Sequence, residues 1–196
     1  MDNKIKLIAG SFGREKVKFN ELLSNHTATR FGGPAKMFAV ATTLRVITRL
    51  VEDCKQLNVP FLVIGTGSKV AFSDSGFLGV VIKNRTQNIK VVSIKGKVSK
   101  KGLGLDFALI EVDSGLTLEK FTQFLSVQGL EDGQFKDLTG SIGGNLFLNP
   151  ALQERVENIR VLDENSELRQ IIWQNLSLRK HVILSVVFKI NAKSKI

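Results

Sequence analysis

The stretch from Phe61 to Ile82 constrains the fold more than any other part of this 196-residue chain. It opens with the apolar run Phe61-Leu62-Val63-Ile64, which predicts a short buried strand, and it closes with a second apolar run, Val80-Val81-Ile82. Between them, Gly65-Thr66-Gly67-Ser68 lets the backbone turn sharply, because glycine adopts left-handed angles at no steric cost. Successive N–H groups pointing one way form a seat for phosphate. Taken alone, a Gly-x-Gly after a strand is more often only a tight turn.

The residues before this stretch predict a strand–helix–strand unit. Lys36 to Val40 is expected as a strand, and Thr43 suits the cap of a helix over Leu44 to Leu57. The helix has one apolar face, so its cysteine, Cys54, is expected in the core rather than as a nucleophile. The unit is expected to be a right-handed crossover with parallel strands. The apolar face consists of Leu44, Ile47, Val51, Cys54 and Leu57.

The second half of the chain predicts mostly antiparallel strands. Asn88 to Lys95 and Phe107 to Val112 are expected as a hairpin, and Thr117 as the cap of a helix over Leu118 to Gln128. A second glycine-rich segment runs from Gly140 to Asn145. The resulting prediction has an N-terminal segment without a clear period (1–20), a small α/β lobe (21–84) and a second α+β lobe (85–196). Further strands are expected at Val156 to Leu162, Leu168 to Ile172 and Val182 to Ile190.

Composition places the chain among ordinary globular proteins, with 43% hydrophobic and 23% charged residues. The first ten residues are too polar for a signal peptide, and no apolar stretch reaches the ~20 residues that span a bilayer. A single cysteine excludes an internal disulfide and a cysteine-based metal cluster. We therefore expect a cytoplasmic protein with no membrane contact and no metal.

The formal net charge of +10 raises the question of nucleic-acid binding. Lys83 to Lys101 holds seven basic residues and Arg179 to Lys195 holds five, and neither stretch holds an acidic one. The first stretch contains no aromatic residue to stack on a base and alternates in places like the solvated face of a strand pair. A solvated face is thus the expected role, and weak, salt-sensitive binding to polyanions is the minor alternative.

Four segments, in order, resemble the N-terminal part of the UDP-N-acetylenolpyruvoylglucosamine reductase family, also called UDP-N-acetylmuramate dehydrogenases. The resemblance covers roughly residues 17–190, and its specificity comes from the co-occurrence of the segments. They are Asn25-His26-Thr27 with Arg30-Phe31-Gly32-Gly33-Pro34-Ala35, Gly65-Thr66-Gly67-Ser68-Lys69 with the strand at Val80, Ser114-Gly115 before the second helix, and Gly129-Leu130-Glu131 with Gly140-Ser141-Ile142-Gly143-Gly144 and Asn149.

The resemblance implies an α+β FAD-binding domain of the vanillyl-alcohol-oxidase/PCMH type, with FAD between a small α/β lobe and a larger antiparallel lobe. It implies NADPH as reductant and an enolpyruvyl UDP-sugar of peptidoglycan synthesis as substrate, with flavin N5 passing the hydride. The cofactor-binding residues that it implies are Arg30, Gly65, Thr66, Gly67, Ser68, Lys69, Val70, Gly115, Gly140, Ser141, Gly143, Gly144, Asn145 and Asn149.

Departures from the family pattern bear on catalysis. Lys69 replaces the asparagine of the family's first loop, and we expect its ammonium to pair with a pyrophosphate. The Tyr-Arg-x-Ser motif that polarises the substrate is absent, since Trp173-Gln174-Asn175-Leu176-Ser177 stands in its place. The family's substrate domain would follow this chain, so a partner chain is one expected source of it. The alternative is a non-catalytic flavin-binding or interaction protein, and no catalytic residue is assigned.

Overall fold

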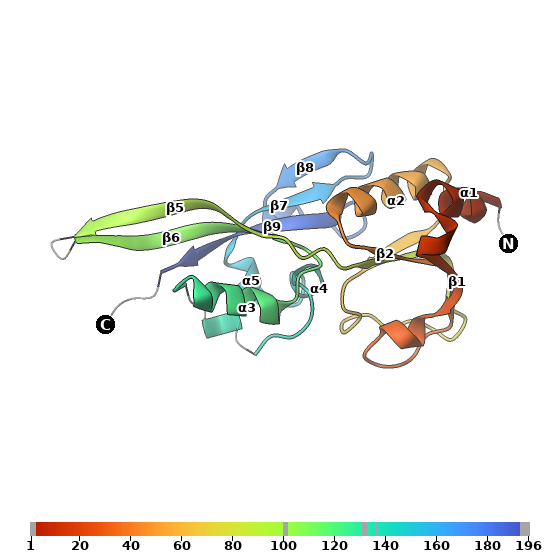
Figure 1. Ribbon diagram of the computed structural model, residues 1–196, viewed down its shortest axis with the longest axis horizontal. Helices are drawn as coiled ribbons and strands as arrows, with labels where there is room; N and C mark the ends of the chain where they lie inside the picture. The colour runs from red at the N-terminus through yellow and green to blue at the C-terminus, as the bar shows by residue number, and fades with distance from the viewer. Residues whose placement is uncertain (1–2, 100–101, 131–132, 136, 193–196) are drawn as a thin grey trace. The chain divides into compact units, whose positions relative to one another are not determined.

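The structure is a computed structural model, and it describes residues 3–99, 102–130, 133–135 and 137–192. The chain forms two compact units, Met1–Thr86 and Gln87–Ile196 (Figure 1). Each unit has one β-sheet and its own helices, and each is considered by itself below. The division lies two residues after the lobe boundary expected from the sequence.

The first unit is built on a four-stranded sheet with the order β1-β2-β4-β3. The β1 strand is antiparallel to β2, whereas β2 and β3 both run parallel to β4. The predicted strand–helix–strand unit is therefore present with parallel strands, but β4 lies between its two strands. The elements of this unit are α1 (Asn3–Phe12), β1 (Val17–Leu22), β2 (Pro34–Ala41), α2 (Leu44–Gln56), β3 (Phe61–Ile64) and β4 (Phe77–Asn84), with short 3-10 helices at Arg14–Lys16 and Leu23–His26.

Helix α2 forms where its cap and its apolar spacing predict it. The Thr43 side chain accepts a hydrogen bond from the Val46 N–H at 3.3 Å and thereby satisfies one free donor of the first turn. The buried positions of the helix are Ile47, Leu50, Val51 and Cys54. Burial raises the pKa of the Cys54 thiol to about 12, so the prediction of a core cysteine is confirmed.

Helix α1 lies in the segment for which the sequence showed no clear period. Only Ile5, Ile8 and Ala9 of this ten-residue helix are buried, so its apolar stripe is short. Three apolar positions are too few to establish a helical period by themselves. The helix is nevertheless part of the first unit, since it contacts α2 and β2.

The second unit is built on a five-stranded sheet with the order β5-β6-β9-β7-β8, and all neighbouring strands are antiparallel. The predicted hairpin and the three later strands are confirmed. Helix α3 and the sheet share one hydrophobic core, in which the rings of Phe121 and Phe188 lie 5.3 Å apart. The elements are β5 (Ile89–Ser99), β6 (Gly102–Asp113), α3 (Leu118–Val127), α4 (Ile142–Asn145), α5 (Pro150–Gln153), β7 (Val156–Leu162), β8 (Leu168–Ile171) and β9 (Val182–Asn191), with 3-10 helices at Gly133–Phe135 and Trp173–Asn175.

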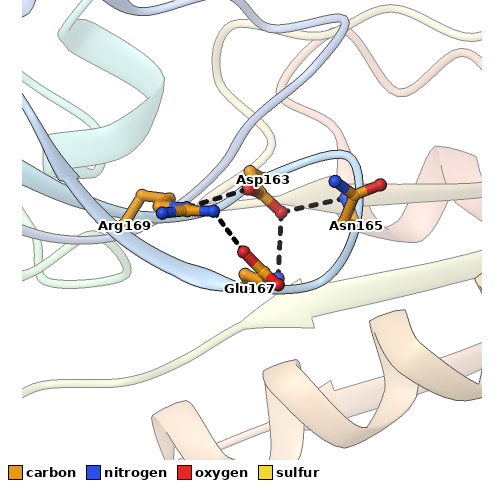
Figure 2. Close-up of polar contacts among 4 residues, drawn as sticks. All are labelled: Asp163, Asn165, Glu167 and Arg169. Atoms are coloured by element: carbon orange, nitrogen blue, oxygen red, sulfur yellow. Dashed lines mark hydrogen bonds and ion pairs between the residues drawn. The ribbon is translucent and has the colours of Figure 1, made fainter.

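The turn between β7 and β8 is fastened by the carboxylate of Asp163 (Figure 2). Its Oδ1 accepts hydrogen bonds from the backbone N–H groups of Asn165 and Glu167, both at 2.9 Å. Arg169 donates from Nε to Asp163 Oδ2 at 3.2 Å and also contacts the Glu167 carboxylate. The Glu167 N–H, followed by the Arg169 side chain, holds the pKa of Asp163 below its ordinary value.

Candidate functional site

The glycine loop, residues Gly65–Val70, follows β3 at the carboxyl end of the parallel strands of the first unit. Among the described residues, no acceptor lies within hydrogen-bonding range of the four backbone N–H groups from Thr66 to Lys69. Protein N–H groups normally have a partner, and a run of free ones at such a strand end is suited to a bound anion. The loop thus has the donors that phosphate oxygens require.

Gly67 is the residue that permits the conformation of this loop. Its φ of 85° lies in the left-handed region, and a Cβ atom built on it would lie 1.8 Å from the carbonyl oxygen of His26. The Ala28 N–H donates a hydrogen bond to the Gly67 carbonyl at 3.1 Å. The chain around His26 therefore clasps the loop from one side. Any residue other than glycine at position 67 would displace the His26 carbonyl.

The segment that clasps the loop is itself ordered by internal contacts. Thr27 donates from Oγ1 to the Phe31 carbonyl at 3.0 Å, and Arg30 has a left-handed φ of 56°. A polar hollow of about 400 Å³ is lined by Ser24, Asn25, Thr27 and Arg30. The structure thus brings Arg30 and the glycine loop into one region of the first unit.

A line of three polar side chains lies between this segment and the sheet. Lys83 Nζ is 3.4 Å from His26 Nδ1, and His26 Nε2 is 2.9 Å from Glu21 Oε1. The His26 ring stacks on Phe38 with 4.1 Å between the ring centroids. Burial, with a smaller effect of the Arg85 charge, lowers the pKa of Lys83, and the hydrogen bond from His26 is the main cause of the lowered pKa of Glu21.

Lys83 was expected on a solvated strand face, and this prediction is wrong. Lys83 is only 7% exposed, and it follows the buried run Val80–Ile82 on β4 with its side chain toward His26. The preceding apolar residues were the signal in the sequence that Lys83 belongs to a buried strand. Lys90 and Lys95 of the same basic stretch are exposed, as expected.

The second glycine segment, Gly140–Asn145, lies beside Ser114 and Gly115 in the second unit. The Leu118 N–H donates to the Gly140 carbonyl at 2.9 Å, and the Gly143 N–H donates to the Ser114 carbonyl at 2.8 Å. A Cβ atom on Gly143 would lie 3.1 Å from the Ser114 Cβ, so this contact is close. The structure therefore brings these two predicted segments together.

Four of the six backbone donors of this second segment, from Ile142 to Asn145, already have acceptors in the protein. Ser141 caps the short helix α4, since its Oγ accepts from the Gly144 N–H at 3.4 Å, and its carbonyl accepts from the Asn145 N–H at 3.1 Å. Asn149 likewise caps α5, through a bond of 3.0 Å from the Ala151 N–H to its Oδ1. The second segment thus differs from the glycine loop in degree, because among the described residues only its Gly140 and Ser141 N–H groups have no acceptor.

Two further observations concern other kinds of site. Among the described residues there is no cluster of three or more His, Cys, Asp or Glu side chains able to hold a metal ion. None of the described helices combines the length and the apolar character needed to cross a bilayer. Glu131, part of the fourth resembling segment, lies outside the described residues.

Residues 35–165 match the FAD binding domain family. The UDP-N-acetylenolpyruvoylglucosamine reductase of Lachnoclostridium phytofermentans is 27% identical over 172 residues, which cover 84% of this chain and 52% of that protein. The protein of the same name from Lactococcus lactis subsp. cremoris is 34% identical over 134 residues, covering 68% of this chain and 40% of the relative. The chain thus spans about half the length of these relatives.

Solved structures share the fold. A p-cresol methylhydroxylase superimposes with a TM-score of 0.68 at 13% identity, covering 100% of this chain and 45% of that one. The UDP-N-acetylenolpyruvylglucosamine reductase of Thermus caldophilus superimposes with a TM-score of 0.66 at 17% identity, covering 90% and 63%. The prediction of an α+β fold of the PCMH type is confirmed by these likenesses.

Proposed function

Since the chain belongs to the FAD binding domain family, we propose that it is the FAD-binding part of an oxidoreductase related to the UDP-N-acetylenolpyruvoylglucosamine reductases. The observation that carries this proposal is the glycine loop with its four unpartnered N–H groups. A dinucleotide offers this loop two adjacent phosphates, and backbone N–H groups bind phosphate without requiring a charged side chain.

The residues around the loop fit a pyrophosphate. Gly67 leaves no room for a side chain on the face that is clasped by the His26 segment, so backbone alone occupies that face. Lys69 and Arg30 are exposed cations at the loop and in the segment that clasps it. Cations of this kind pair with phosphate oxygens, and the Lys69 ammonium offers a charge where the family's asparagine offers only an amide.

The second glycine segment has a different part in this proposal. Because the N–H groups of Gly143 and Asn145 already donate within the protein, they are not offered to a phosphate. The absence of side chains at Gly143 and Gly144 instead allows close packing within the protein, since Cβ atoms there would lie 3.1 Å from the Ser114 Cβ and 3.2 Å from the Ser141 Oγ.

Bound FAD would supply the hydride transfer, and the protein would bind and orient the reactants. We take a UDP-linked enolpyruvyl sugar as the substrate from the names of the relatives, and NADPH as the reductant from the family resemblance in the sequence. No residue of this chain is assigned to polarise or protonate the substrate. Complete turnover therefore requires protein beyond the matched region, in the same polypeptide or in a partner chain.

One observation favours the alternative of a flavin-binding protein without this activity. The segment that stands where the family has Tyr-Arg-x-Ser presents an exposed Gln174 and packs Trp173 against Phe147, with ring centroids 5.2 Å apart. An amide side chain brings no positive charge to a developing enolate. This segment thus packs the Trp173 ring against Phe147, and it presents no positively charged side chain that could polarise a substrate.

The absorption spectrum of the freshly purified protein tests FAD binding. We expect the flavin bands, and release of FAD rather than FMN on denaturation. A protein that neither carries nor takes up FAD would contradict the proposal. Oxidation of NADPH that depends on the enolpyruvyl UDP-sugar then separates the reductase from the non-catalytic alternative.

A further inference from the structure

We propose that His26 is a positioning residue for the glycine loop, held as one neutral tautomer between the side chains of Lys83 and Glu21. The proposal rests on the proposed FAD site only for its effect on affinity, because the tautomer and the loop contact are measurable without cofactor. The sequence patterns singled out neither Glu21 nor Lys83, and they included His26 only as part of the first resembling segment.

The donors and acceptors in this line of side chains determine the tautomer. An ammonium only donates hydrogen bonds and an ionised carboxylate only accepts them. Nδ1 of His26, 3.4 Å from Lys83 Nζ, must therefore be the acceptor, and Nε2, 2.9 Å from Glu21 Oε1, must carry the hydrogen. The ring is thus neutral, with its proton on Nε2.

The three side chains come from separate elements, and the ring ties these elements together. Glu21 belongs to β1, His26 ends the 3-10 helix after it, and Lys83 belongs to β4, where it pairs in register with Ile64 immediately before the glycine loop. Stacking on Phe38 sets the plane of the ring. The position of the His26 backbone is consequently fixed from three sides.

That backbone is the part of the protein that contacts the glycine loop. The His26 carbonyl occupies the space in which a Gly67 side chain would lie, and the next residue but one, Ala28, donates to the Gly67 carbonyl at 3.1 Å. Holding the ring therefore holds the contact that shapes the loop. The buried ammonium gives this arrangement its strength, since Lys83 without its acceptor would be a buried charge with a lost partner.

Other charges near this line act at its two ends. Lys18 contacts Glu21 at 3.1 Å and is exposed, and the charge of Arg85 contributes to the lowered pKa of Lys83. Lys18 favours an ionised Glu21, so that Glu21 is an acceptor for the hydrogen on His26 Nε2.

A matched pair of His26 variants tests the contact with Lys83 and the contact with Glu21 separately. In His26→Asn, the amide oxygen takes the place of Nδ1 and still accepts from Lys83. In His26→Gln, the amide nitrogen takes the place of Nε2 and still donates to Glu21. Both variants lose the ring, so they differ only in which contact is kept. Lys83→Met removes the ammonium while keeping the length of the side chain.

The first readout is hydrogen exchange of the Ala28 amide in the full chain without cofactor. Loss of one hydrogen bond of about 1.4 kcal/mol corresponds to about tenfold faster exchange, which we expect in Lys83→Met and His26→Gln. His26→Asn should lie nearer the wild type. The Val46 amide, bonded within the first turn of α2, serves as the internal control and should be unchanged. FAD affinity should likewise be reduced in Lys83→Met and His26→Gln, and it should lie nearer the wild-type value in His26→Asn.

The second readout is the ¹⁵N spectrum of the His26 ring in the wild-type protein, which needs no variant. We expect a protonated Nε2 and an unprotonated Nδ1, and loss of this preference in Lys83→Met. A proton on Nδ1, or Ala28 exchange and FAD affinity that stay unchanged in Lys83→Met, would overturn the proposal. A wild-type protein that fails to bind FAD would contradict the proposed function alone, because the tautomer and Ala28 exchange would still decide this inference.

Discussion

Gly67 is the residue on which the glycine loop depends most directly. Alanine at a φ of 85° costs about 1–2 kcal/mol, and its Cβ would displace the His26 carbonyl. We therefore expect Gly67→Ala to weaken FAD binding at least about tenfold in a calorimetric titration. Gly10→Ala is the matched control, since nothing lies within 4 Å of its Cβ position. Equal affinities for Gly67→Ala and the wild type would show that the loop does not hold the cofactor.

Lys69 tests whether a side-chain charge adds to the backbone donors. An exposed ion pair contributes about 0.2–1 kcal/mol, so Lys69→Ala should weaken FAD binding about two- to fivefold. The loss should shrink at high ionic strength, because exposed charges are screened by salt. Lys36→Ala, another exposed lysine of the first unit, should leave the affinity unchanged. An unchanged dissociation constant for Lys69→Ala rules out the pairing.

At the scale of single elements, the β7–β8 turn makes a prediction that does not depend on any cofactor. The pKa of Asp163 is lowered in the folded protein, mainly by the Glu167 N–H, so its stabilising effect is present above about pH 4. It is lost as the pH falls through the lowered folded-state value. We expect Glu167 amide exchange to quicken in Asp163→Ala, and in the wild type at acid pH.

Glu164→Gln is the control for this turn, because Glu164 is exposed and contacts only Lys180, at 3.9 Å, among the contacts described for it. Its substitution should leave the Glu167 amide unchanged. If the Glu167 amide exchanges equally fast in Asp163→Ala and in the wild type at neutral pH, the carboxylate does not fasten the turn.

The elements that the sequence predicts best are those with a sustained hydrophobic period. Helix α2 and strands β7 and β9 carry such a period and were predicted to within one residue at each end. The helices α4 and α5 have four residues each, which is too short for any period. Strand β1 escaped prediction because Val17 is its only buried residue.

At the scale of the whole chain, the glycines indicate the candidate site, but the contact between His26 and Lys83 that supports it does not follow from the sequence patterns. Gly65 and Gly67 follow an apolar run and so mark a turn. Lys83 and His26 are 57 residues apart, and their contact depends on which strands pair. Pairing across β1, β2 and β4 is a tertiary property, and no local pattern predicts it.

The chain spans about half the length of the reductases that it resembles, and it forms two units. The first unit offers four free backbone donors, and the second offers a glycine segment in which the N–H groups from Ile142 to Asn145 already donate within the protein. In the proposed function, this domain binds and orients a flavin, and no residue of it is assigned to the chemistry of the substrate.

The central claim is that the backbone of the glycine loop binds the pyrophosphate of FAD. A titration of ¹⁵N-labelled protein with FAD, followed by amide chemical shifts, tests it most directly. We predict large shifts for the amides of Thr66, Gly67, Ser68 and Lys69, with FMN producing much smaller ones because it lacks the pyrophosphate. FAD that binds without moving these four amides, or that does not bind at all, would contradict the account.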